Sequence, residues 1–278
     1  MPLLSQEDHD HLREYGYLVV HDVVPAAHCN AVIKTLWEFL GVDPNDRAAW
    51  YQKPVSPGGL VEIYQHQTLW DNRQYPKIHQ IFSELWGTEK LWVSIDRAAL
   101  KVPSHPDHPE YDNKGFIHWD TDSTRVPPSS GLQGVLYLAD TAENQGGFQC
   151  VPELYQQFDT WVKTQPKDRS AHHPDLTGFT VTPIPGKAGD LVIWDVMLPH
   201  GSGHNTSNQP RFAQYISMSP AEKMTLETRE QRLNCWKNHL PPRNSIFPGD
   251  ERKLEEQFGH TAQLTQLGRK LLGVDDWA

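Results

Sequence analysis

The sequence has few cysteines, and the three that it has lie far apart, at Cys29, Cys150 and Cys235, with no CxxC pair. This spacing argues against a disulfide framework and against a zinc knuckle, and it is typical of a protein in a reducing cytosol. The first residues contain neither the basic segment nor the apolar run of a secretory signal. We therefore expect buried or idle thiols and a cytoplasmic protein.

Long apolar runs and excess positive charge are also missing. None of the 278 residues belongs to an uninterrupted apolar stretch near the roughly 20 residues that span a bilayer, so no membrane segment is predicted. The 25 Lys and Arg against 35 Asp and Glu give a formal net charge of −10. This charge disfavours nucleic acid as a partner, and with it a nucleic-acid oxygenase. A small-molecule partner remains, and the oligomeric state is left open.

The chain shows no internal repeat and no linker of biased composition, so we expect a single domain over residues 1–278. Residues 1–90 are predicted to be mostly helical, with a long loop at 42–75 that contains several Pro and Gly. Residues 91–220 alternate short apolar runs with turn residues, which is typical of a β-sandwich or barrel. Residues 221–278 are predicted to form a helical tail. The expected fold class is mainly β with flanking helices.

Individual elements follow from caps and periodicity. A helix should begin after Ser5 and end at Gly16, and a second should begin at Pro25 and end at Gly41. We predict further helices at 76–86 and 154–162, and strands at 17–24, 91–102, 116–119, 132–138, 147–151, 179–184, 191–196 and 212–218.

A metal site is indicated by His118 and Asp120, which are separated by one residue in an apolar, strand-like context. Side chains at i and i+2 of a strand point to the same face, so both can reach one ion while Trp119 faces the other way. His200 follows the predicted strand 191–196 and is the best third ligand. Two His and one carboxylate form the ligand set of non-haem Fe(II) oxygenases.

Two other HxD triplets compete with this assignment. Both have a Pro between the two residues and lie in polar, loop-like surroundings: His105-Pro106-Asp107 and His173-Pro174-Asp175. Because Pro is poorly tolerated inside a strand, the same-face argument fails for both, and we interpret them as solvated loops.

Arg211 follows His200 by eleven residues and opens an apolar strand. The intervening Gly and Asn residues predict a tight turn that returns the guanidinium towards the metal. An arginine there can bind a carboxylate through both arms of its planar fork, although a surface ion pair is the commoner fate of an arginine.

The stretch His200-Gly-Ser-Gly-His-Asn-Thr-Ser-Asn-Gln-Pro-Arg211 resembles the distal signature of the phytanoyl-CoA dioxygenase family of Fe(II)/2-oxoglutarate oxygenases. His118-Trp-Asp120 matches the proximal motif of that family, and Asn144–Pro152 and the opening helix–strand–helix are also similar. The resemblance covers most of residues 5–220. It implies a double-stranded β-helix (a cupin-like jelly roll) within residues 91–220.

By this resemblance His118, Asp120 and His200 would ligate iron. Arg211 would hold the far carboxylate of 2-oxoglutarate, with Ser202 beside it, and Arg97 would fall near a cofactor-lining position. Some family members place a lysine near the cofactor, but no equivalent is found at residues 60–66. Pro152-Glu-Leu-Tyr155 also departs from the family's Pro-Gly-Ser-His.

The implied activity is hydroxylation or desaturation of a small molecule with O₂, which releases succinate and CO₂. Related halogenases have a small residue at position 120, so a carboxylate there favours hydroxylation or desaturation. Residues that could contact the substrate, with core packing as the alternative for the aromatics, are Trp119, Arg125, Gln133, Tyr137, Trp50, Tyr51 and Tyr64. His204 is either a supporting group or exposed.

Two alternatives remain open. A cupin-like metalloenzyme could use the same three ligands with Zn or Mn and without 2-oxoglutarate, which would leave Arg211 idle. A non-catalytic binding protein with a degenerate site is disfavoured by the intact ligand set.

Overall fold

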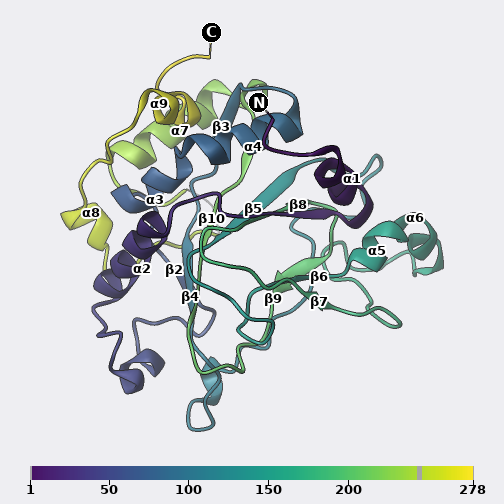
Figure 1. The fold of residues 1–278 in the computed structure, drawn as a ribbon, viewed down its shortest axis with the longest axis horizontal. Helices are drawn as coiled ribbons and strands as arrows, with labels where there is room; N and C mark the ends of the chain where they lie inside the picture. The colour runs from purple at the N-terminus through teal and green to yellow at the C-terminus, as the bar shows by residue number, and fades with distance from the viewer. Residues whose placement is uncertain (1, 243–245, 278) are drawn as a thin grey trace.

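The computed structural model describes residues 2–242 and 246–277, which form antiparallel sheets flanked by helices (Figure 1). The main sheet has six strands in the order β1-β8-β5-β10-β4-β2, a second has the order β7-β6-β9, and β11 pairs with β3. The strands are β1 (Tyr17–Val20), β2 (Leu60–Val61), β3 (Leu91–Val93), β4 (Ala98–Lys101), β5 (Leu132–Tyr137), β6 (Phe148–Cys150), β7 (Thr182–Pro183), β8 (Leu191–Asp195), β9 (His200–Ser202), β10 (Arg211–Tyr215) and β11 (Met218–Pro220).

Helices lie on one face of the main sheet and at its ends (Figure 1). They are α1 (Gln6–Tyr15), α2 (Ala26–Leu40), α3 (Gln67–Arg73), α4 (Pro76–Trp86), α5 (Pro152–Gln156), α6 (Phe158–Trp161), α7 (Leu226–Lys237), α8 (Leu254–Phe258) and α9 (Gln266–Leu272), with short 3₁₀ turns η1 (Arg47–Tyr51), η2 (Pro109–Tyr111), η3 (Val162–Thr164) and η4 (Ala221–Lys223).

Alternation along each strand gives the main sheet two apolar faces. On β8, Leu191 and Ile193 join a core shared with α2, α3 and α4, whereas Val192 and Trp194 join a second core that contains Phe148 of β6. The first face is therefore covered by helices, and the second, which we call the inner face, is covered by the three-stranded sheet.

The first two predicted helices are confirmed. Ser5 accepts from the backbone N–H of Asp8, whose carboxylate accepts from the backbone N–H of Ser5 in return, and this capping box starts α1. Gly16 ends α1 in the left-handed region at φ 78°, where a residue with a Cβ would be strained. The helix at 76–86 is also confirmed.

Residues 42–75 are not simply the predicted loop, because they contain η1, β2 and α3. Leu69 and Trp70 of α3 are fully buried in the main core. A seven-residue helix is too short to show a helical period, so its stability depends on this burial rather than on a local pattern.

Predicted strands 91–102 and 212–218 are each split in two. The first gives β3 and β4 and the second gives β10 and β11, with the breaks side by side, since the Ser94 N–H donates to the Ser217 carbonyl. At these breaks both segments leave the main sheet, and β3 and β11 pair with each other in a separate two-stranded sheet. A continuous apolar run cannot reveal such a change of sheet.

Three shorter predictions were partly wrong. The run 116–119 forms only a single bridge between His118 and His200, and 179–184 forms only β7. The predicted helix at 154–162 is instead α5 and α6 followed by η3.

The C-terminal region is helical, as predicted, but it is part of the main core rather than a tail. Leu271 and Leu272 of α9 are fully buried there, and so is Cys235 of α7. The buried Arg232 guanidinium donates to the carbonyls of Val93 and Leu271, which ties α7 to β3 and α9. All three cysteines are buried, as expected.

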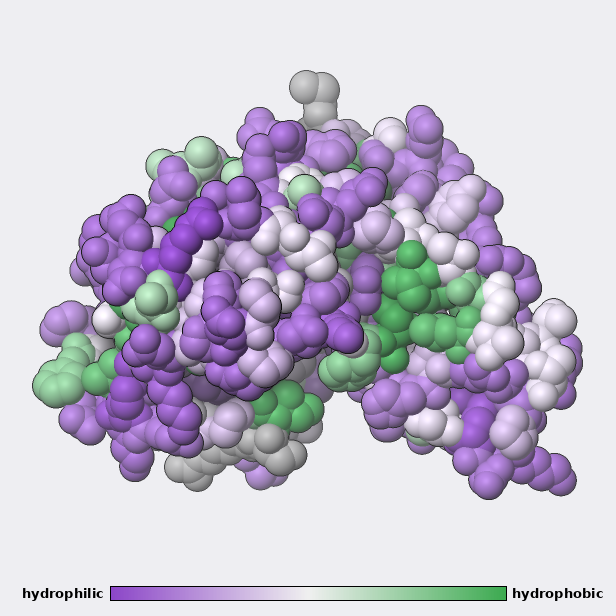
Figure 2. Space-filling model, turned by 90° about the horizontal axis from the view of Figure 1, so that it is seen from below, coloured by the Kyte–Doolittle hydropathy of each residue, from purple (hydrophilic) through white to green (hydrophobic). Residues whose placement is uncertain are grey.

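The surface is mostly hydrophilic, as the polar composition of the sequence predicts. Figure 2 looks at the end of the molecule away from α4 and α9, and this face is mostly hydrophilic, with apolar residues gathered beside one hollow. No helix within the described residues is both long and apolar enough to cross a bilayer.

Candidate metal centre

His118, Asp120 and His200 meet at one point, with one potential ligand atom from each lying within 4.8 Å of the others. His118 and His200 are locked together by their backbones, since the N–H of each donates to the carbonyl of the other at 2.9 and 3.0 Å. Asp120 lies between the rings, with Oδ1 3.2 Å from His118 Nε2 and Oδ2 3.4 Å from His200 Nε2. This single β-bridge thus brings the His118 and Asp120 side chains to His200, as the predicted strand at 116–119 was expected to do.

The protonation states suit a divalent metal. His200 Nδ1 lies 2.9 Å from the Leu198 carbonyl, which only an N–H can satisfy, so the proton is on Nδ1 and the Nε2 lone pair faces the shared point. Burial alone would raise the pKa of Asp120. Hydrogen bonds with His118 and His200 lower it by more than burial raises it, so the pKa lies well below the usual range. With side chains 24% and 47% exposed, His118 and Asp120 leave one side of the site open.

Gln133 holds the carboxylate ligand in place. Its Nε2 donates to Asp120 Oδ2 at 2.7 Å, and its Oε1 accepts from the Trp194 indole at 3.0 Å. Both ends of the amide are engaged, so Gln133 orients Asp120, and its predicted contact with the substrate stays a prediction. The sequence contained no local signal for the pairing, which depends on β5 lying beside the 118–120 segment.

We expect Gln133→Ala to weaken metal binding about tenfold, because partners that orient a ligand are typically worth 10–100-fold in affinity. Anaerobic titration of the protein with Fe(II) or Co(II) measures this. Gln165→Ala, which removes a half-exposed glutamine whose side chain donates to Thr164, is the matched control. Equal affinities for the two variants would show that Gln133 does not support the site.

Two buried cations lie on the inner face beyond the triad. Arg211 of β10 and Lys101 of β4 are direct cross-strand neighbours, and they are only 4% and 2% exposed. Arg211 Nε donates to the Gly146 carbonyl at 3.0 Å, and Lys101 Nζ donates to the Gly203 carbonyl. Within residues 2–242 and 246–277 neither forms an ion pair with a carboxylate. Buried charges are normally paired, so this pair of cations is suited to binding an anion.

Burial lowers the pKa of Lys101 to about 7, and the neighbouring Arg211 lowers it as well, while Asp112 acts in the opposite direction. Sequence reasoning sought a lysine at residues 60–66 and missed this one. The available signal was a lone lysine at the end of the apolar run Ala98-Ala-Leu-Lys101.

Small residues lie between the triad and the two cations. Ala213 and Ala99 pair on the inner face, where the alternation also places Arg211 and Lys101. Gly201, between His200 and Ser202 in β9, faces away from this space, and a Cβ there would lie 2.0 Å from the Phe116 carbonyl oxygen. Ser202 follows His200 by two residues in β9, so the two share a face.

Two other residues predicted to contact the substrate, Trp119 and Tyr137, instead form contacts within the protein core. Trp119 is buried and its indole donates to the Met197 carbonyl, so it packs in a core on the far side of the 118–120 segment. The Tyr137 hydroxyl donates to the Ile184 carbonyl and accepts from the Phe148 N–H, which ties the two sheets together. For both residues core packing replaces substrate contact.

Arg97 is also corrected. Its guanidinium pairs with Glu62 at 3.0 Å and with Asp96 at 3.6 Å, and it lies four residues along the strand from Lys101. The cation beside Arg211 is therefore Lys101. Arg125 is exposed in the loop after Asp120.

The remaining candidates do not join the triad. Trp50 and Tyr51 are buried in the main core, as is Tyr64. His204 forms an ion pair with Asp112. In the part of the chain that the structure describes, His118, Asp120 and His200 form the one metal-competent cluster, so neither His-Pro-Asp triplet belongs to one.

Known proteins resemble this chain in sequence and in fold. A family model described as phytanoyl-CoA dioxygenase (PhyH) matches residues 12–213. A Dictyostelium discoideum protein that carries the family's name is 22% identical over 96% of this chain and 86% of its own length. The ectoine dioxygenase of Bordetella bronchiseptica is 26% identical over 66% of this chain and 64% of its own.

Among solved structures, the GlcNAc-inducible gene 2 protein of Candida albicans superposes with a TM-score of 0.74 at 14% identity, over 99% of this chain and 77% of its own. The epimerase SnoN, solved with Fe³⁺, alpha ketoglutarate and nogalamycin RO, has a TM-score of 0.55 at 15% identity, over 78% of this chain and 83% of its own. These structural likenesses concern the fold.

Proposed function

Because this chain belongs to the phytanoyl-CoA dioxygenase family of Fe(II)- and 2-oxoglutarate-dependent dioxygenases, we propose that it hydroxylates or desaturates a small-molecule substrate. One observation carries this proposal: an open His–Asp–His triad shares the inner face of the sheet with two buried cations that lack an anionic partner. The triad alone would serve a cupin-like Zn or Mn enzyme equally well. That alternative gives no role to Arg211 and Lys101.

In this proposal His118, Asp120 and His200 hold iron, and Arg211 and Lys101 bind the far carboxylate of 2-oxoglutarate. Bound iron supplies oxidation with O₂, in which 2-oxoglutarate is converted to succinate and CO₂. Gln133 keeps Asp120 in place, and Ala99 and Ala213 leave room for the co-substrate. Ser202 lies on the His200 face of β9, where its hydroxyl can assist the carboxylate. Arg125, exposed in the loop that follows Asp120, remains a candidate substrate contact.

We further propose that the two facing sheets form a double-stranded β-helix within a single domain. Support comes from the antiparallel pairing throughout and from the shared core between Val192 and Phe148 of opposite sheets. Most of the strands lie within the core expected over residues 91–220, and β1 and β2 add one edge strand at each side of the main sheet.

The class is tested by anaerobic binding of Fe(II) and then of 2-oxoglutarate, followed by 2-oxoglutarate-dependent succinate release across a panel of small molecules. We expect saturable binding of both and weak uncoupled succinate release without substrate. Tight Zn or Mn binding without any 2-oxoglutarate binding would instead favour the cupin-like alternative.

Lys101 should make 2-oxoglutarate binding depend on pH. With its pKa lowered to about 7, this lysine is largely neutral at pH 8 in the free protein. A bound carboxylate favours the charged form and raises the pKa, so binding at pH 8 should take up close to one proton. Affinity should then fall as pH rises above 7, by up to about tenfold per unit.

Calorimetry of 2-oxoglutarate binding in two buffers of different ionisation enthalpy measures the proton uptake. Lys101→Met should remove it. Lys187→Met, which removes an exposed lysine paired with Asp140, should leave it unchanged. Binding without proton uptake in the unaltered protein would show that Lys101 does not face the co-substrate.

A further inference from the structure

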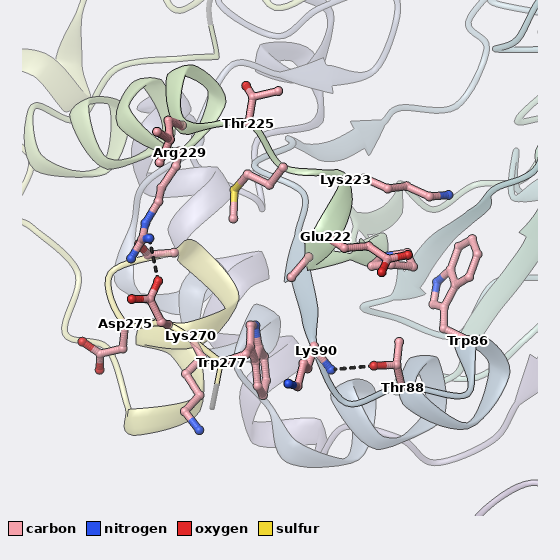
Figure 3. Close-up of a pocket in the computed structure, with 16 residues that line it drawn as sticks. Trp86, Thr88, Lys90, Glu222, Lys223, Thr225, Arg229, Lys270, Asp275 and Trp277 are labelled. Atoms are coloured by element: carbon pink, nitrogen blue, oxygen red, sulfur yellow. Dashed lines mark hydrogen bonds and ion pairs between the residues drawn. The ribbon is translucent and has the colours of Figure 1, made fainter.

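A hollow of about 810 Å³ lies outside the metal centre, among the ends of α4, α7 and α9 and the β3–β11 pair (Figure 3). Its lining residues include none of those at the triad or at the Arg211–Lys101 pair. These elements lie at the end of the molecule away from β6 and β9 (Figure 1). The volume falls in the range of about 300–1,000 Å³ that is typical of small-molecule sites.

Two indole rings form fixed walls of this pocket. The Trp86 N–H donates to the Met218 carbonyl at 2.8 Å, and the Trp277 N–H donates to the Leu91 carbonyl at 2.9 Å. Met218 and Leu91 belong to the two strands of one ladder, so the same small sheet holds both rings. Trp277 also stacks on His79, with ring centroids 5.5 Å apart. The walls are therefore ordered before any ligand arrives.

Each indole is accompanied by a lysine. Lys223 Nζ lies 5.1 Å from the Trp86 ring centroid, and Lys270 Nζ lies 5.1 Å from that of Trp277. The two pairs stand on different sides of the hollow, and Lys90 lies close to Trp277 (Figure 3). The rings restrain the ammonium groups by cation–π attraction without neutralising their charge.

The charged side chains around the hollow that lack an ion pair are mostly lysines. Among the described residues, Lys90, Lys223 and Lys270 have no ion pair with a carboxylate. Two of the lining acids are already neutralised, Asp275 by Arg269 at 2.7 Å and Asp276 by Arg229 at 2.6 Å. Of the lining acids only Glu222 remains.

We propose that this pocket binds a small planar organic carboxylate, with its flat apolar part against the indoles and its anionic group among the lysines. Aromatic walls select the flat apolar part, and the unpaired ammonium groups select its charge. Most of the lining comes from residues 220–277, which follow the region matched by the family model. The site is therefore independent of the function proposed for the metal centre.

Naphthalene-2-carboxylate is a suitable probe, with naphthalen-2-ylmethylamine as the control of opposite charge. We expect saturable calorimetric binding of the carboxylate and at least tenfold weaker binding of the amine. Lys223→Ala combined with Lys270→Ala should weaken carboxylate binding about tenfold, since both attractive cations are removed.

Two further variants make the result specific. Lys187→Ala removes an exposed lysine elsewhere and should bind the probe normally. His200→Ala disables the metal centre and should also bind it normally. Circular dichroism checks that every variant is folded. The proposal is overturned by no saturable binding up to the probe's solubility, by equal binding of the amine, by unchanged binding in the double lysine variant, or by loss of binding in His200→Ala.

Discussion

Replacing Asp120 with alanine should abolish 2-oxoglutarate-dependent turnover and weaken Fe(II) binding by more than about a hundredfold. Loss of a partner that merely orients a ligand already costs 10–100-fold, and Asp120 supplies the only carboxylate of the triad. Its oxygens lie 3.2 and 3.4 Å from the two imidazoles. Within the described residues the cluster contains no fourth His, Cys, Asp or Glu that could replace it as a ligand. Anaerobic metal titration and succinate release measure the two effects.

The sequence provides a matched control in the triplet His105-Pro106-Asp107. Asp107 has the same local motif, but its side chain is exposed and it belongs to no metal-competent cluster in the described chain. Asp107→Ala should therefore retain metal affinity and turnover. Full activity in Asp120→Ala would remove the basis of the proposed iron site.

Arg211→Met should raise the KM for 2-oxoglutarate by about a hundredfold. Removing one member of a buried, hydrogen-bonded charge pair costs roughly 2–5 kcal/mol, and every 1.4 kcal/mol is tenfold in affinity. The guanidinium is already oriented by the bond from Nε to the Gly146 carbonyl, so its other nitrogens are available for a carboxylate. Lys101 remains in the variant and should retain residual binding.

The metal affinity of Arg211→Met should stay close to normal, because Arg211 forms no contact with the triad. This separates loss of the co-substrate from loss of the metal. Arg13→Met is the control, since it removes an exposed arginine of α1 that pairs only with the neighbouring Asp10 in the described chain. A KM for 2-oxoglutarate that changes equally in both variants, or in neither, contradicts the assignment.

Local sequence context was enough to select the three residues of the metal centre. Pro106 and Pro174 exclude two of the three HxD triplets from a strand, and the structure brings His118 and Asp120 together with His200. The reasoning succeeded because side-chain direction depends on immediate neighbours. It holds even though residues 116–119 form one bridge instead of a strand.

Contacts between distant segments were not predictable in the same way. Lys101 and Arg211 are 110 residues apart, and they become neighbours only through the register of β4 against β10. Gln133 and Tyr137 were both predicted to be possible substrate contacts. Only the structure shows their polar atoms bound to Asp120, Ile184 and Phe148.

By itself, the sequence predicted the class of the protein, the His–Asp–His ligand set, the arginine that follows it and a β-sandwich or barrel that carries them. These depend on residue type and on short periods along the chain. The tertiary structure alone decided which cation stands beside Arg211, which polar groups are already occupied, and that segments near residues 86, 223 and 277 enclose a second pocket. Those features depend on strand register and helix packing, which sum weak contacts over the whole chain and leave no mark in any one segment.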